Sequence, residues 1–240
     1  MEIDLLVFIL VVGVIALVWC RHDYLAWKGL GVGGLPHTFK GWYTMTRLRM
    51  KKGEPILTDI LDPHIGKEGD HVYLGDLILR NGPRPTVAVH PIPHRQLDQH
   101  ATTGISQKLK LIFDEAVNTR VGLVEYKLSF YEKHTLAVTL CHPECGHVYA
   151  IGTHGEIGHI HPSDGSMHMI LSPSDTKQAI NKKWGERHGL AGKGSLPLTY
   201  LFVYAPRDEM ELGVAKNLLD AAIGHMSLQA FPAQPIPSPE

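Results

Sequence analysis

The stretch Gly155–Ser172 reads GEIGHIHPSDGSMHMILS, and it decides the fold in the middle of the chain. Strand-like segments lie on both sides of Asp164-Gly165, and this dipeptide between such segments is the strongest short signal for a β-hairpin. A two-residue turn at Asp164-Gly165 predicts that Pro162 faces Met167 and that His161 faces His168. A longer turn would shift this register.

Three histidines of the hairpin are predicted to share one face of the sheet. Side chains two residues apart in a strand point to the same side, so His159 accompanies His161, and His168 comes from the opposite strand. Three imidazoles in one place suit acid/base catalysis, because histidine titrates near neutral pH. They also suit an ion such as iron, zinc or copper. A polar sheet face with solvated histidines is the third interpretation.

The carboxylates weaken the metal interpretation. Glu156 precedes the histidine pair with the opposite strand parity to His159, and no glutamate follows His161 at the distance expected in cupins. We therefore expect metal-free acid/base catalysis by His159, His161 and His168. A metal-dependent enzyme, with iron or zinc on the same three histidines, is the alternative. Glu156 is a candidate for substrate binding.

A second polar cluster follows in KKWGERHGLAG, residues 182–192, just after a predicted helix. Such a position suits the rim of a cleft. Arg187 is suited to hold an anionic oxygen, and Trp184 to stack on a flat ligand. We expect Arg187 and His188 in catalysis, and Trp184 and Glu186 in substrate binding. In the alternative, Trp184 belongs to the core and Glu186 pairs with Arg187 or a lysine.

The pattern of apolar residues extends the fold outward from these clusters. Strands are expected within residues 124–140, 146–152 and 198–206, and helices at 105–120, 172–183 and 207–227. Residues 41–61 fit a helix or a long strand that ends near Lys52-Gly53. The fold class is therefore α+β: a mostly antiparallel sheet with packed helices, preceded by one N-terminal transmembrane helix.

The N-terminus carries sixteen apolar residues, LLVFILVVGVIALVWC, from Leu5 to Cys20. A helix of this length rises about 24 Å, slightly less than the ~30 Å hydrocarbon core, and it can still cross a locally thinned bilayer. A signal peptide would begin with basic residues, whereas Glu2 and Asp4 are acidic. A buried helix that is apolar on every face is unusual. We expect a membrane anchor.

The flanks of the anchor predict its orientation. Arg21 and Lys28 follow the apolar run and no basic residue precedes it, so the body should lie in the cytosol, at the endoplasmic reticulum. Trp19, with Tyr24 or Trp27, is expected at the membrane interface. The predicted parts are an anchor at 1–22, a glycine-rich tether at 23–40, a domain at 41–228 and a disordered proline-rich tail at 229–240.

The composition narrows the classes of function. A formal net charge of −1 gives no general attraction to DNA or RNA, so no nucleic-acid partner is expected. Sixteen histidines among 240 residues favour proton transfer or metal binding. Three cysteines form no disulfide framework, which suits a reducing compartment. The segment CHPECGH, residues 141–147, is expected to be a turn rather than a zinc site.

Several segments taken together resemble the fungal luciferase domain, the family of the 3-hydroxyhispidin-dependent luciferases of luminous mushrooms. These segments are GEIGHIHPSDGSMHMILS, NKKWGERHGLAG and FVYAPRDEMELGVAKNLLDAAIGHM, with GWYTMTRLRM and LGDLILRNGPRPTVAVHPIPHRQ upstream. The resemblance covers about residues 40–227. It matches the family's His-x-His and following histidine at His159, His161 and His168, and its Trp-Gly-x-Arg-His at residues 184–188.

The resemblance implies a chemistry for these residues. Active members of the family add O₂ to a hydroxylated α-pyrone without a dedicated cofactor, and a peroxidic intermediate then loses CO₂. A non-catalytic binding protein that keeps the fold is the competing class. The Pro162–Ser166 segment and Glu186 depart from the luminous members, so the chain resembles the non-luminous luciferase-like proteins. The expected partners are a small oxygenated aromatic or pyrone and, through the N-terminal helix, a membrane.

Overall fold

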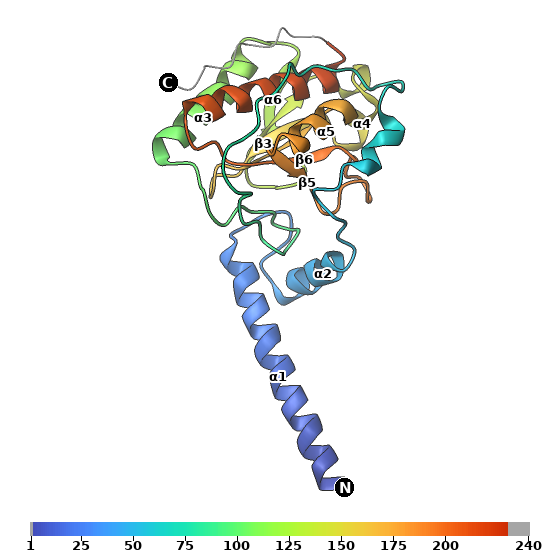
Figure 1. Cartoon of the computed structure of the whole chain (residues 1–240), viewed down its shortest axis with the longest axis vertical. Helices are drawn as coiled ribbons and strands as arrows, with labels where there is room; N and C mark the ends of the chain where they lie inside the picture. The colour runs from blue at the N-terminus through green and yellow to red at the C-terminus, as the bar shows by residue number, and fades with distance from the viewer. Residues whose placement is uncertain (1, 230–240) are drawn as a thin grey trace.

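The computed structural model describes residues 2–229 of the chain. An α+β body stands on one long N-terminal helix (Figure 1). The tail expected at 229–240 lies outside the described residues, apart from Gln229.

The body is built on a six-stranded sheet in the order β1-β2-β3-β4-β6-β5, and every neighbouring pair is antiparallel. The strands are β1 Val124–Leu128, β2 Leu136–Leu140, β3 Glu156–Ile160, β4 Met167–Ile170, β5 Gly185–Arg187 and β6 Tyr200–Val203. The α+β class and the antiparallel sheet are confirmed.

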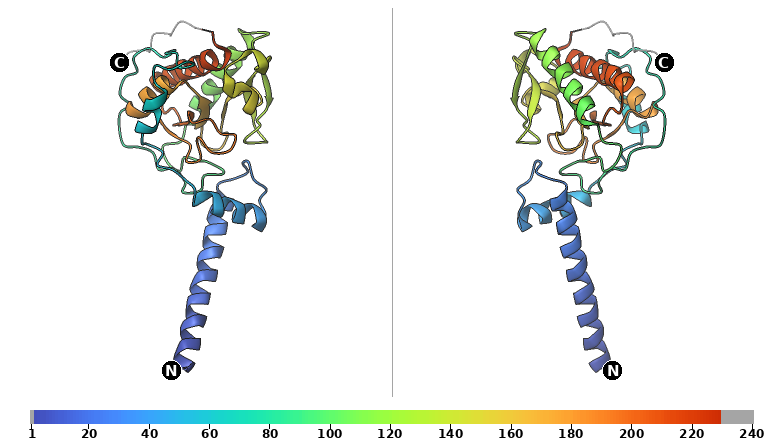
Figure 2. Two further views of the ribbon diagram at one scale, coloured as in Figure 1. Left: turned by 90° about the vertical axis from the view of Figure 1, so that its right-hand side faces the viewer. Right: turned by 90° about the vertical axis from the view of Figure 1, so that its left-hand side faces the viewer.

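Helices cover one face of the sheet (Figure 2). The helix α6, Glu209–Ser227, packs on β3 and β4, and α3, Thr103–Asn118, packs beside it; α5, Pro173–Asn181, lies against β5. Asp208 caps α6 by accepting a hydrogen bond from the Glu211 amide, and Ser172 caps α5 in the same way. Met167, Met169 and Leu201 point from the sheet into this apolar layer.

The hairpin forms with a longer turn than the sequence predicted. His159 pairs with His168 and Ile160 with Met167, so the expected pairing of His161 with His168 is wrong. The His161 amide donates to the Ser166 carbonyl, which leaves four residues, Pro162–Gly165, in the loop. The reason lies in Asp164, whose carboxylate accepts from the Ser166 amide at 2.8 Å and from the Gln96 amide at 2.9 Å. The shift is two residues, so the three histidines still share a face.

The segment 146–152 is a short helix, α4 Val148–Gly152, and not the predicted strand. The ring of His147 accepts from the Tyr149 amide at its N-terminus, and Val148 and Ile151 are exposed. Before it, Pro143–Cys145 form one 3₁₀ turn, as expected for CHPECGH.

The N-terminal helix α1 spans Glu2–Gly29, and Asp4–Gly29 is the one described helix long and apolar enough to cross a membrane. It continues to Gly29, into the segment 23–40 that was expected to be a glycine-rich tether. Trp27 is fully buried and donates to the Ile92 carbonyl at 2.7 Å, so it is not an interfacial residue, whereas Trp19 is exposed. The body is therefore fixed to the end of α1.

A second helix, α2 Phe39–Arg49, packs against the end of α1. Asp23 of α1 accepts from the Trp42 indole at 2.7 Å, from Arg49 at 2.8 Å and from His90 at 3.1 Å. One carboxylate thus joins α1, α2 and the body.

Candidate functional site

The histidines lie on the sheet face opposite α6. Residues paired across neighbouring strands share a face, and the register places His159, His168, Phe202 and Glu186 in one row across β3, β4, β6 and β5. Two positions along, His188 and Tyr200 fall on the same side, and the ring of His168 stacks on Tyr200 at 4.5 Å.

Loops cover this face of the sheet, whereas helices cover the other face. His94 comes from the proline-rich segment before α3, and its ring lies 4.1 Å from Phe202, 4.8 Å from His188 and 5.4 Å from His168, between ring centres. Neither ring nitrogen of His94 has a hydrogen-bond partner within residues 2–229. The turn between β1 and β2 brings Glu132 to the same side.

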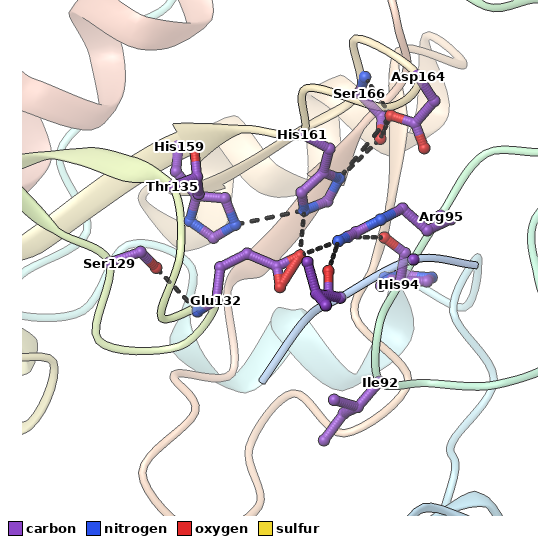
Figure 3. Close-up of polar contacts among 12 residues, drawn as sticks. Ile92, His94, Arg95, Ser129, Glu132, Thr135, His159, His161, Asp164 and Ser166 are labelled. Atoms are coloured by element: carbon purple, nitrogen blue, oxygen red, sulfur yellow. Dashed lines mark hydrogen bonds and ion pairs between the residues drawn. The ribbon is translucent and has the colours of Figure 1, made fainter. Parts of the chain in front are cut away.

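A chain of hydrogen bonds orients two of the histidines, and Figure 3 shows the part around His161. His159 Nδ1 lies 2.7 Å from Glu156 Oε1, and His161 Nδ1 lies 2.8 Å from the Ser166 hydroxyl. That hydroxyl donates to Asp164 at 2.6 Å. The two Nε2 atoms face each other at 3.3 Å. All five side chains are buried, so this network is screened little by water.

Glu132 and Arg95 complete this side of the site. Glu132 Oε1 lies 3.7 Å from His161 Nε2 and forms an ion pair with Arg95. The Arg95 guanidinium also donates to the carbonyls of Val32 and His94, at 2.8 and 2.9 Å. Figure 3 shows Glu132 between the imidazole of His161 and Arg95.

Burial favours the neutral form of His94, His161, His168 and His188. Loss of solvation holds the pKa of His94, His161 and His168 well below the ordinary 6.5, and neighbouring basic side chains add to the effect. The same cause lowers the pKa of His188 to about 4. Neutral imidazoles can accept a proton or bind a metal ion, so the site is supplied with bases and donors.

The tautomers of two histidines follow from their backbone contacts. His168 Nδ1 donates to the Leu201 carbonyl at 3.2 Å, so its Nε2 keeps the lone pair. His188 uses both nitrogens: Nε2 donates to the Pro91 carbonyl at 2.9 Å, and Nδ1 accepts from the Leu190 amide at 3.0 Å. His168 is therefore the better base, and His188 is held as part of the wall.

A cavity of about 250 Å³ opens onto this face. Its lining combines imidazoles and other aromatic rings with Glu132: His94, His159, His168, His188, Phe130, Tyr131 and Tyr200. A second cavity of about 490 Å³ lies beside α3 and reaches His161 from the other end of the hairpin. The first cavity has the size and lining for one small flat ligand.

The structure separates the residues that the sequence grouped. Glu186 lies in the histidine row and pairs with Arg84 at 2.5 Å and the Tyr204 hydroxyl at 2.8 Å. Glu156 orients His159 rather than lining the cavity. Arg187 pairs with Leu201, so it points to the opposite face, and it donates to the Glu54 carbonyl. Trp184 belongs to the apolar core and donates to the Ile78 carbonyl.

Sequence reasoning missed His94, Arg95 and Glu132. His94 and Arg95 sit in a proline-rich segment without periodicity, and Glu132 sits in a turn, so neither strand parity nor helical spacing could place them on the face. Two groups of described residues could hold a metal ion: His94 with His168 and His188, and Glu132 with His159 and His161. The second group supplies the carboxylate that the sequence appeared to lack.

Comparison with known proteins identifies the family. The luciferase domain matches residues 154–222, which contain the hairpin. The chain is 31% identical to the luciferase of Armillaria gallica over 230 residues, covering 90% of this chain and 85% of that protein. The luciferase of Neonothopanus nambi is 29% identical over 222 residues, covering 86% and 81%. No solved structure matches the chain significantly.

The fold and the histidine face thus describe an α+β protein with a small buried site. The extent of the similarity shows that the chain belongs to the fungal luciferase family. The expected family is confirmed.

Proposed function

We propose that the protein is a luciferase-like enzyme that oxidises a small, flat, oxygenated molecule, such as a pyrone or a phenol, with O₂. Family membership supports the class of reaction. The observation that carries the proposal is His168, a neutral imidazole with a fixed tautomer in the wall of a ligand-sized cavity. Aromatic rings of Tyr131, Tyr200 and Phe130 would bind the flat faces of the ligand.

The chemistry begins with a proton transfer. His168 Nε2 takes the proton of an enol or phenol, and the resulting anion carries the electron density that reduces O₂. A carbon–oxygen bond forms, and the two electrons for it come from the substrate, which leaves a peroxide anion. Loss of CO₂ from that peroxide is what the family resemblance adds. Light emission is not part of the proposal, because the resemblance implies that Pro162–Ser166 and Glu186 depart from the pattern of the luminous members.

The test is oxygen uptake by the full chain in detergent with 3-hydroxyhispidin and simpler hydroxylated pyrones and phenols. Removing a general base costs about 10²–10⁴-fold in rate, so His168→Ala should lose at least 100-fold. His142→Ala, in an exposed histidine that pairs with Glu144, is the matched control. Wild-type uptake by His168→Ala would contradict the proposal. Photon counting in the same samples separates oxidation from luminescence.

We also propose that α1 spans the membrane and that α2 lies on its cytosolic surface, at the endoplasmic reticulum. Arg49 of α2 lies 5.8 Å from the Trp19 ring, at the end of the apolar run, which supports a position at headgroup depth. Phe39, Tyr43 and Met50 are exposed. On a helix they form one apolar stripe, flanked by Lys40 and Arg47, which is the pattern of an interfacial helix.

The cavity adjoins this membrane-proximal end. Gly34, Ile92 and Pro93 line it, and Trp27 of α1 holds the Ile92 carbonyl. A substrate dissolved in the bilayer surface would therefore have a short path to the histidines, which favours an apolar aromatic molecule.

A fluorescent label at Tyr43→Cys, in a chain whose three native cysteines are replaced by serine, tests the position of α2. Nitroxides at headgroup depth should quench this label and leave a control label at the exposed Val121→Cys bright. Equal quenching at both positions would contradict the placement. External protease should digest the body in sealed microsomes if it faces the cytosol.

A further inference from the structure

The histidine pair contains an unresolved electrostatic conflict. A carboxylate only accepts hydrogen bonds, so His159 Nδ1, 2.7 Å from Glu156, carries the ring proton. The Ser166 hydroxyl gives its proton to Asp164, so it must accept from His161 Nδ1 at 2.8 Å. With both rings neutral, neither Nε2 atom carries a proton. Two lone pairs face each other at 3.3 Å in a buried place, and a positive charge between them would remove the repulsion.

Glu132 supplies a third donor at the same point. Its Oε1 lies 3.7 Å from His161 Nε2, and the donor atoms of Glu132, His159 and His161 all lie within 4.8 Å of one another. With metal–ligand bonds of about 2.0–2.2 Å, tetrahedral neighbours are about 3.3–3.6 Å apart. Two of the observed separations, 3.3 Å between the imidazoles and 3.7 Å between Glu132 and His161, are close to these values, and the third is at most 4.8 Å.

The surroundings match those of a metal centre. Metal-binding histidines almost always donate their second ring N–H to a carboxylate or another oxygen, and both histidines do so here, to Glu156 and Ser166. The network buries the carboxylates of Glu132, Glu156 and Asp164 but only one guanidinium, that of Arg95. Arg95 holds Glu132 in place without balancing the remaining negative charge.

We propose that Glu132, His159 and His161 bind one divalent first-row transition-metal ion, with a coordination position open to the cavity. Two imidazoles and a carboxylate suit Fe²⁺ or Zn²⁺, and they leave such a position free. Glu132 and His159 line the 250 Å³ cavity, so the ion lies in its wall. The other group is less suited, because both nitrogens of His188 are already bonded.

This site departs from the cofactor-free chemistry that the family resemblance implies, and it replaces His168 in the expected three-histidine set by Glu132. It does not rest on the proposed reaction. His168 remains free to act as a base beside the ion.

The experiment measures metal in the full chain purified in detergent without chelating resin. Mass spectrometry of metal content should give about one Fe or Zn per chain. After chelation, Co²⁺ titration should restore one site with visible absorption bands of a four- or five-coordinate ion. Glu132→Gln and His161→Ala should each weaken Co²⁺ binding at least tenfold, and Ser166→Ala, which removes the hydroxyl that orients His161, by about 10–100-fold. His142→Ala should bind as wild type does.

Melting temperature separates loss of the site from loss of the fold. Co²⁺ or Zn²⁺ should raise the melting temperature of the chelated wild type and leave that of a folded Glu132→Gln unchanged. Less than a tenth of an ion per chain, or equal binding by wild type and Glu132→Gln, would overturn the inference. Oxygen uptake that persists in the chelated protein supports the proposed reaction alone, whereas a bound ion without turnover supports the metal site alone.

Discussion

Acidification should destabilise the protein through His225, which lies far from the proposed site. Its ring is fully buried in α6, and neither nitrogen has a hydrogen-bond partner within residues 2–229. The ring of His147 lies 4.2 Å away and those of Tyr73 and Tyr149 both 6.3 Å away, and Asp70 and His71 are further titratable groups nearby. Burial, with help from His147, lowers the pKa of His225 to about 3.

The direction of the effect follows from linkage. The unfolded chain protonates this histidine near its ordinary 6.5 and the folded chain only near 3, so between these values the unfolded state binds more protons. Stability is complete above pH 6.5 and is lost as the pH falls toward 3. At pH 5 the solution is about 1.5 units below the pKa of this histidine in the unfolded chain. At about 1.4 kcal/mol per unit, the free energy of unfolding is lower by about 2 kcal/mol.

The assay is urea unfolding of the full chain in detergent at pH 7 and pH 5. His225→Phe keeps an aromatic ring against Tyr73 and His147 but cannot titrate. Other buried histidines also resist protonation, so both proteins should lose stability, and the wild type should lose about 2 kcal/mol more. If both proteins lose the same amount, His225 is solvated or hydrogen-bonded and the reasoning fails.

Two further substitutions test charged hydrogen bonds, one at the junction of α1 with the body and one in the histidine row. Asp23→Asn removes the charge that Arg49 and His90 share, and urea unfolding should show a loss of about 2 kcal/mol; an unchanged midpoint would mean that α1 and the body are not joined there. Glu186→Gln leaves Arg84 and Tyr204 without their anion and should cost about 1–2 kcal/mol, because Arg84 is half-exposed. Unfolding equal to wild type would exclude that buried pair.

The pattern of the sequence was sufficient for the sheet and for one face of the site. Strand parity placed His159, His161 and His168 on the same side, and this survived a two-residue error in register because side chains repeat every two residues. Strand parity predicted that Glu156 would point away from His159, and this prediction was wrong. The strand pairing shifts between Val138 and Thr139, and the carboxylate of Glu156 reaches His159.

The rest of the site comes from loops, in which the apolar residues have no regular spacing. His94, Arg95 and Glu132 reach the face from loops, whose course is set by contacts distant in sequence, such as Gln96 with Asp164. Trp184 and Arg187 were grouped with the histidines only because they lie near them in the sequence. In a strand, neighbouring residues point apart, so Glu186 and Arg187 lie on opposite faces.

The turn that decides the hairpin can itself be tested at Gly165. Its φ is +79°, and a Cβ there would lie 2.6 Å from Ala101 Cβ. Gly122 has φ +82° with open space around it, so Gly122→Ala measures the backbone strain alone, about 1–2 kcal/mol. Gly165→Ala should cost about 1–3 kcal/mol more because the turn is overpacked. Asp164 and Ser166 flank this glycine, so Co²⁺ binding should weaken in Gly165→Ala only. Equal losses in both variants would show that the turn is free to move, and that it does not hold His161.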